Sequence, residues 1–250
     1  MDGAQSPKDD KPPEEVNVII SGGGPWGPGT PWPPVPVNSS WLIANAMPRV
    51  IFRGNGLPDI RLMLYPEPIP SSWSWIREKI PQFWDGSKEF FGVYRGADES
   101  LNFPIAAMLH MGMLDQPNEA FRLEKHAYRD GYEFPDIDGR RPDHDDLTGG
   151  GTWGDIPDKL STDLDINFVH DKVKADIEAA NIIISHDHER FLCGYEYFTS
   201  LAAAYNRSEK KRLLYLHTPI EHDSKDIQHG VRIVVKIVES MVEDVERQMR

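Results

Sequence analysis

The amino-acid sequence predicts an α/β protein, a single-domain three-layer αβα sandwich around a mostly parallel or mixed central sheet. Short runs rich in β-branched residues alternate along the chain with longer segments whose apolar residues recur at helical spacing. Glycine- and proline-rich turns separate the two kinds of segment. Strands without polar alternation, interleaved with helices, are typical of a sheet covered on both faces.

The apolar runs predict five buried strands. A run of this kind that ends at glycine or a polar turn is read as a strand inside a covered sheet. The expected strands are Val16–Ile20, Ile60–Tyr65, Phe103–Met113, Asn181–Ser185 and Arg212–His217.

Helical periodicity and capping residues predict five helices between these strands. Asn38–Met47 begins at a capping asparagine and is stopped by Pro48, and a second helix begins at Ser71 or Ser72. Three more are expected at Asp165–Ala180, Phe191–Tyr205 and 227–245. The proline-rich segment 25–36 and the Asp-, Gly- and Pro-rich segment 133–158 are expected to be loops.

Composition bounds the domain organisation and the partners. Residues 1–15 are polar and predict a disordered N-terminal tail, and residues 16–250 predict one domain. The net charge of −13 opposes nucleic-acid and anionic-lipid binding. With neither a signal peptide nor an apolar run of membrane-spanning length, a cytoplasmic protein is expected. The sequence leaves the oligomeric state open.

Cys193 is the only cysteine in the sequence, so it cannot form an internal disulfide. A lone cysteine is more often an inert buried residue than a reactive one. Cys193, however, follows an expected strand and lies near the start of an expected helix. Backbone N–H groups at a helix N-terminus favour a thiolate, so this position predicts a nucleophile.

His217 ends the strand that follows Cys193 in the sequence. Neighbouring parallel strands bring their carboxyl ends to one edge of a sheet, so the thiol and the imidazole are expected to meet there. Such a pair needs a third group to orient the ring, usually a carboxylate or an amide. The chain has 40 acidic residues, and residue pattern alone selects none of them.

Two segments around this pair match a known pattern. Ser185–Gly194 matches S-x-x-A-G-x-F-V-C-N at its serine, phenylalanine and cysteine, and Leu216–Pro219 matches an H-I-P context at its histidine and proline. Both patterns are those of pyroglutamyl peptidase I, a family of cysteine peptidases that remove N-terminal pyroglutamate. The chain resembles that family.

The resemblance continues over nearly the whole chain in the same order. Ser21–Gly27 and Val37–Trp41 resemble T-G-F-x-P-F-G and V-N-P-S-W, and Leu123–Ala127 and Phe134–Pro142 resemble P-E-R-V-A and I-P-D-N-x-G-x-x-P. The resemblance implies a Cys193–His217–Glu124 triad. It also implies that Trp26, Gly23, Gly24 and Met113 bind substrate.

The chain departs from the family mostly where the family recognises its substrate. Gly23 and Trp26 replace two phenylalanines, His188 and Glu189 replace the A-G before the nucleophile, and the stretch from Met113 replaces Q-A-G-G-R. The implied function is removal of an N-terminal pyroglutamyl or related blocked residue from peptides, without a cofactor. The alternative is an inactive or re-specialised member of the fold that acts as a binding protein.

Two other site types have partial matches in the sequence. Gly22, Gly24 and Gly27 fit the G-x-G-x-x-G pattern of dinucleotide sites, but the prolines that follow oppose the helix which such a site requires. His186–Glu189 has the residue types of a zinc site, although a polar turn explains the segment equally well. No metal site is predicted.

Overall fold

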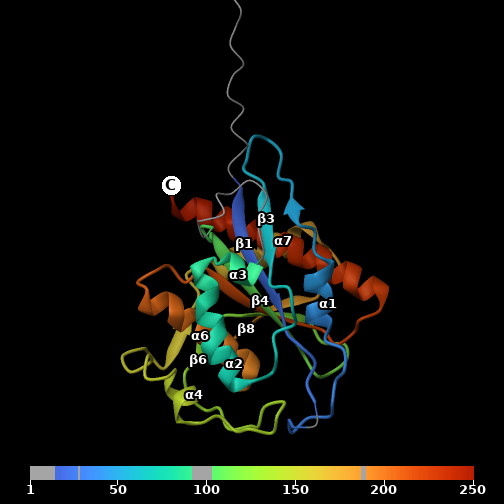
Figure 1. Ribbon diagram of the computed structural model, residues 1–250. Coiled ribbons are helices and arrows are strands. Elements are labelled where there is room, and N and C mark those ends of the chain that lie inside the picture. The colour runs from blue at the N-terminus through green and yellow to red at the C-terminus, as the bar shows by residue number, and fades with distance from the viewer. Residues whose placement is uncertain (1–14, 28, 92–102, 187–189) are drawn as a thin grey trace, which may run out of the picture.

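The computed structural model describes residues 15–27, 29–91, 103–186 and 190–250 (Figure 1). The expected tail therefore lies outside the described residues except for Glu15, whose carboxylate pairs with the Arg61 guanidinium at 2.6 Å. None of the helices in these ranges combines the length and the apolarity that crossing a bilayer requires.

A seven-stranded mixed sheet forms the centre of the molecule, with the strand order β2-β3-β1-β4-β9-β5-β8. Four consecutive strands of this sheet, β3-β1-β4-β9, run parallel to one another. Strand β2 is antiparallel to β3, and β5 is antiparallel to β9 but parallel to β8. The strands are β1 Val16–Gly22, β2 Val50–Ile51, β3 Ile60–Leu64, β4 Ala107–Met113, β5 Phe121–Glu124, β8 Ile182–Ser185 and β9 Leu213–Thr218. A separate pair consists of β6 His126–Tyr128 and β7 Lys159–Ser161.

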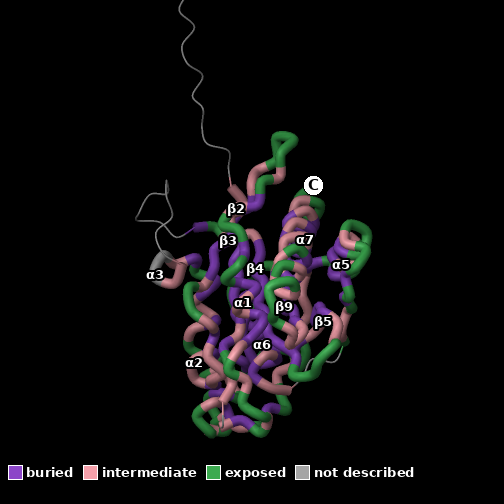
Figure 2. Tube along the Cα trace, turned by 90° about the vertical axis from the view of Figure 1, so that its right-hand side faces the viewer, coloured by how far each residue is buried: buried purple, intermediate pink, exposed green. Residues whose placement is uncertain are grey.

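Helices cover both faces of the sheet, which confirms the predicted α/β sandwich. One core cluster joins the sheet to α1 Ser39–Ala46, α5 Ile166–Asp176 and α7 Ser224–Gln248. The opposite cluster joins it to α2 Trp73–Lys79, the 3₁₀ helix η1 Ile80–Asp85 and α6 Leu192–Asn206. Figure 2 shows the buried residues concentrated in the central strands and the exposed ones in the connecting turns. The short helices are α3 Lys88–Phe91 and α4 His144–Thr148.

Local sequence explains where the long helices begin. The Asn38 side chain accepts a hydrogen bond from the Ser40 N–H at the start of α1, as predicted. Asp223 and Asp226 form a capping box at the start of α7, whose apolar residues recur on one face and are buried against the sheet. Asp165 caps α5 by accepting from the Phe168 N–H.

Several local predictions were wrong in detail. The segment 133–158 was expected to be loop throughout, but a capping box at Asp143 stabilises the short helix α4. The strand expected from Phe103 begins only at Ala107. Strand β8, expected to be buried, lies at the edge of the sheet, where Ile183 is 45% exposed. Strand β5 was missed because its four residues alternate apolar with charged side chains and form no apolar run.

The expected neighbourhood of the strands before Cys193 and His217 was also wrong. Strand β5 lies between β8 and β9 and runs antiparallel to β9. The carboxyl ends of β8 and β9 therefore point in opposite directions. Cys193 meets His217 from the start of α6, which packs on that face of the sheet, and the two strands do not end at a shared edge.

Candidate active site

A row of polar side chains crosses the sheet beneath α6. Ser21 of β1 pairs in register with His110 of β4, and His110 pairs with Tyr215 of β9. Tyr215 pairs with Glu124 of β5, which in turn pairs with Ser185 of β8. Residues on either side of Tyr215 pack into the opposite core, so the period-two alternation of the strands turns this row towards α6.

Helix α6 places a second line of polar groups over this row. Cys193, Glu196 and Ser200 follow one another at the i, i+3 and i+7 spacing, which puts their side chains on one stripe of a helix. Glu196 and Ser200 are buried, and Cys193 is a free, partly exposed thiol. Cys193 is the second residue of α6, so it also lies beside the N–H groups of the first helical turn.

The three implied triad residues are brought together on this face. His217 Nδ1 lies 2.8 Å from Glu124 Oε1, and both side chains are buried. His217 also forms a side-chain hydrogen bond with Cys193. Because Nδ1 faces the carboxylate, Nε2 is the ring nitrogen that remains for the thiol.

The charge state of His217 follows from these contacts. Burial lowers the pKa of His217, but the hydrogen bonds to Cys193 and Glu124 and the negative charge of those groups outweigh burial and raise it to about 10. The imidazole is therefore protonated at neutral pH. A cation held beside a thiol favours the thiolate, which is the nucleophilic form.

Gly112 of β4 makes room for the Cys193 side chain. It pairs in register with His217, and a Cβ atom at this position would lie 2.9 Å from Cys193 Sγ and 2.5 Å from the Tyr215 hydroxyl. The thiol thus rests against the backbone of the sheet. Sequence reasoning did not identify Gly112, whose requirement arises only from this close approach.

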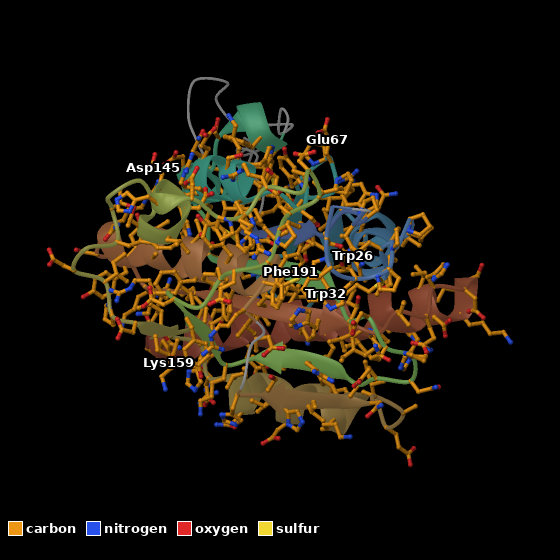
Figure 3. The ribbon with its side chains drawn as sticks, turned by 90° about the horizontal axis from the view of Figure 1, so that it is seen from below. Trp26, Trp32, Glu67, Asp145, Lys159 and Phe191 are labelled. Atoms are coloured by element: carbon orange, nitrogen blue, oxygen red, sulfur yellow. The ribbon has the colours of Figure 1, made fainter. Side chains whose placement is uncertain are left out.

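A pocket opens beside Cys193, and the four residues expected to bind substrate all line it. These four are Trp26, Gly23, Gly24 and Met113. The pocket wall also includes residues that the sequence did not single out for binding, among them Trp32, Asn38, Ile69, Ile76, Asp115, Phe191, Glu196 and Tyr215. Figure 3 shows Trp26, Trp32 and Phe191 gathered near the centre of the view, far from Lys159 and Asp145.

The aromatic wall is a packed unit. The ring centroids of Trp32 and Phe191 are 4.4 Å apart, and Phe134 lies 5.2 Å from Trp32. The Trp26 indole N–H donates to the carbonyl of Pro33, which fixes that ring at the pocket rim. These rings offer flat apolar surface next to the thiol, which suits a small ring or acyl group.

The glycines after β1 serve close packing. A Cβ on Gly24 would lie 2.9 Å from the Ile69 carbonyl oxygen, and one on Gly22 would lie 2.7 Å from the Trp41 Cα. In the described residues no helix begins between β1 and Ser39, so the dinucleotide alternative lacks the helix it needs.

Within the described residues no cluster of three potential metal ligands occurs. Three residues of the segment considered for zinc, Asp187, His188 and Glu189, lie outside the described residues.

Glu196 and Tyr215 are buried polar residues of the site that the sequence did not reveal either. Glu196 is the sole acidic residue in α6, and it lies one turn after Cys193. A lone acid in an otherwise uncharged helix, three positions from a candidate nucleophile, was the available signal. Tyr215 gave no such signal, since a tyrosine in a strand is common in cores.

Comparison with known proteins agrees with the fold. No family model matches the chain. Human pyroglutamyl-peptidase 1 is 24% identical over 231 residues, covering 92% of this chain and 91% of the human protein.

Solved structures of two relatives share the fold. Pyrrolidone carboxyl peptidase from Thermococcus litoralis matches with a TM-score of 0.67 at 16% identity, covering 93% of this chain and 96% of that one. Pyroglutamyl peptidase I from Bacillus amyloliquefaciens matches with a TM-score of 0.61 at 15% identity, covering 92% and 96%. The chain is thus similar over nearly its whole length to pyroglutamyl-peptidase 1, and it shares the fold of these solved peptidase structures.

Proposed function

We propose that this protein is a cysteine peptidase that removes an N-terminal pyroglutamyl residue, or a closely related blocked residue, from peptides. The observation that supports this most strongly is the hydrogen-bonded line from Cys193 through His217 to Glu124 beside an aromatic pocket. The human relative carries the name pyroglutamyl-peptidase 1, and it matches almost the full chain.

The first chemical step is acyl transfer to sulfur. The Cys193 thiolate attacks the carbonyl carbon that joins the blocked residue to the next one, and a C–S bond forms. The C–N bond then breaks as the His217 imidazolium gives its proton to the leaving amine. Water, deprotonated by His217, hydrolyses the thioester and releases the free blocked residue. Glu124 keeps the ring oriented and stabilises its positive charge throughout.

The start of α6 supplies donors for the oxyanion. The N-cap residue Phe191 makes no side-chain cap, so the N–H groups of the first turn are left for a ligand. Cys193 stands within that turn, which places its own N–H close to the attacked carbonyl. A well-placed donor of this kind contributes roughly 3–4 kcal/mol to transition-state stabilisation.

The proposed surroundings of the enzyme follow from its chemistry. The partner is a peptide with a blocked N-terminus, whose ring would lie against Trp32 and Phe191. Because activity requires a reduced Cys193, we propose that the protein works in the cytoplasm, where thiols are kept reduced.

A re-specialised member that binds a ligand without cleaving it is the second candidate. The altered pocket supports it, since Gly23 offers no side chain to the wall and Glu196 adds a carboxyl group to it. This candidate predicts ligand binding without Cys193-dependent turnover.

Release of aminomethylcoumarin from a pyroglutamyl amide tests the proposal. Wild type should release the amine, whereas Cys193→Ala and His217→Ala should not. His222→Ala is the matched control, because His222 is exposed and bonds only to the nearby Ile220 carbonyl among the described contacts. Absence of release from folded wild type, together with binding of the substrate, would replace the peptidase by the binding candidate.

A further inference from the structure

A buried hydrogen-bond network lies on the side of Cys193 away from Glu124. The Tyr215 hydroxyl forms a side-chain hydrogen bond with Cys193 and lies 3.3 Å from Glu196 Oε2. The other carboxyl oxygen, Oε1, lies 3.2 Å from His110 Nδ1 and accepts a hydrogen bond of 3.4 Å from the Ser21 hydroxyl. Of these five groups, the proposed peptidase mechanism uses Cys193 alone.

Four ionisable groups lie near Glu196 in the part of the chain that the structure describes. His110 approaches from β4, Tyr215 and His217 from β9, and Cys193 from the same helix, while β1 contributes the uncharged Ser21. Burial lowers the pKa of His110 to about 3, so that ring is neutral and offers Glu196 no opposite charge. The hydrogen-bond partner of His110 Nδ1 is the Ser21 hydroxyl at 2.6 Å. Ser200 bonds the far ring nitrogen of His110 at 3.0 Å.

The protonation state of Glu196 decides which way the Tyr215 hydroxyl points. A carboxylate only accepts, so it would draw the single Tyr215 proton to itself. A protonated carboxyl can instead donate to the Tyr215 oxygen, which frees the Tyr215 proton for the sulfur. Burial raises the pKa of Glu196 to about 8 against the opposing effect of its hydrogen bonds, so the protonated form prevails at neutral pH.

We propose that the Tyr215 hydroxyl donates a hydrogen bond to the Cys193 sulfur and that the protonated Glu196 carboxyl is the positioning residue which holds it in that direction. The inference rests on the proposed role of Cys193 as nucleophile. Loss of the Glu196 proton turns Tyr215 towards the carboxylate, and the thiolate loses its donor. The nucleophile thus has two supports, His217 on one side and the Tyr215–Glu196 pair on the other.

The consequence is measurable without any peptide. A thiolate that loses a hydrogen-bond donor becomes more basic and more nucleophilic. When the pKa of a thiol rises by about one unit, the rate constant for reaction of its thiolate rises about threefold. Because Cys193 is the only cysteine, alkylation of the whole protein reports on this one sulfur.

The test is the rate of iodoacetamide alkylation between pH 5 and 9.5, followed by intact mass. Wild type should show the rise in rate that accompanies thiolate formation and a further step of about threefold near pH 8. Glu196→Gln, which keeps the shape and a donor but cannot ionise, should lack the step near pH 8. Tyr215→Phe should also lack it, and its first rise should move to higher pH by about one unit.

Tyr195→Phe is the matched control. It removes a buried tyrosine hydroxyl from α6 whose partner is the Asp146 carbonyl at 2.8 Å, and it should reproduce the wild-type profile. A step near pH 8 that persists in Glu196→Gln, or a first rise that Tyr215→Phe leaves in place, would overturn the proposal. Circular dichroism of each variant separates these results from misfolding, and Glu196→Gln decides alone if Tyr215→Phe does not fold.

The two proposals fail in different ways. Alkylation requires no pyroglutamyl substrate, so absence of peptide cleavage leaves the profile of Cys193 readable. Conversely, cleavage with an unchanged alkylation profile in both variants would retain the peptidase and remove the Tyr215–Glu196 switch.

Discussion

His217 Nδ1 lies 2.8 Å from Glu124 Oε1, and both groups are buried beneath α6. The two residues are 93 positions apart in sequence and are joined by the antiparallel pairing of β5 with β9. In a buried environment such a charge-assisted hydrogen bond orients the ring and stabilises its protonated form. Four predictions follow from this pair and its surroundings.

Replacing Glu124 by Gln should reduce kcat/KM for the pyroglutamyl amide by about 100-fold or more, because the ring loses its negative partner. The pKa of His217 should fall at the same time, since the hydrogen bond and charge of Glu124 help to raise it. Kinetics with the fluorogenic amide and an NMR titration of His217 measure the two effects. Glu119→Gln is the control, because its carboxylate pairs with Arg122 at the surface. An unchanged His217 titration in Glu124→Gln would contradict this account.

Glu196→Gln should change stability in a pH-dependent way. Burial raises the folded-state pKa of Glu196 from 4.5 to about 8, so the folded protein holds a proton that the unfolded chain releases. The stability linked to that proton is complete below about pH 4.5 and is lost as pH rises through 8. The free energy of unfolding of the variant minus that of wild type should therefore be more favourable to the variant at pH 9 than at pH 5. The expected change in this difference is on the order of 3 kcal/mol. Urea unfolding at both pH values measures this, and equal differences at pH 5 and pH 9 would refute it.

Gly112→Ala should impair the nucleophile directly. The new methyl group would lie 2.9 Å from Cys193 Sγ and 2.5 Å from the Tyr215 hydroxyl, so those groups must move. We expect a loss of about 1–3 kcal/mol in stability and a drop in Cys193 alkylation and turnover. Gly154→Ala is the control, since a Cβ there meets no atom within 4 Å. Wild-type alkylation in Gly112→Ala would show that the sulfur is not confined by β4.

Trp32→Ala should weaken substrate binding and leave the thiol reactive. The ring packs against Phe191 at 4.4 Å in the pocket wall and is not among the described contacts of the triad. We expect KM to rise about tenfold, the effect of losing an aromatic contact of roughly 1–2 kcal/mol, with little change in the alkylation rate. Phe52→Ala, at a site that is 80% exposed, is the control. If KM stays at its wild-type value, substrate does not use this wall.

The sequence alone determined the layers and pointed to Cys193 as the candidate nucleophile. Strand-like runs and helical periodicity required an α/β sandwich, because each element must bury its apolar face, and the structure confirms it. Cys193 was identifiable by its position at a helix start and His217 by its position at a strand end. Glu124 was assigned through the family resemblance, since its residue type alone could not distinguish it from 39 other acids.

Only the tertiary structure decided how these residues meet. Strand β5 has no apolar run by which it could be recognised, yet its insertion between β8 and β9 puts Glu124 beside Tyr215 and within reach of His217. The contacts of Tyr215 and Glu196 with each other and with the sulfur depend on strand register and on the path of α6 across the sheet. Periodicity records which side of an element is buried, but which elements lie against that side is set by packing between residues far apart in the chain.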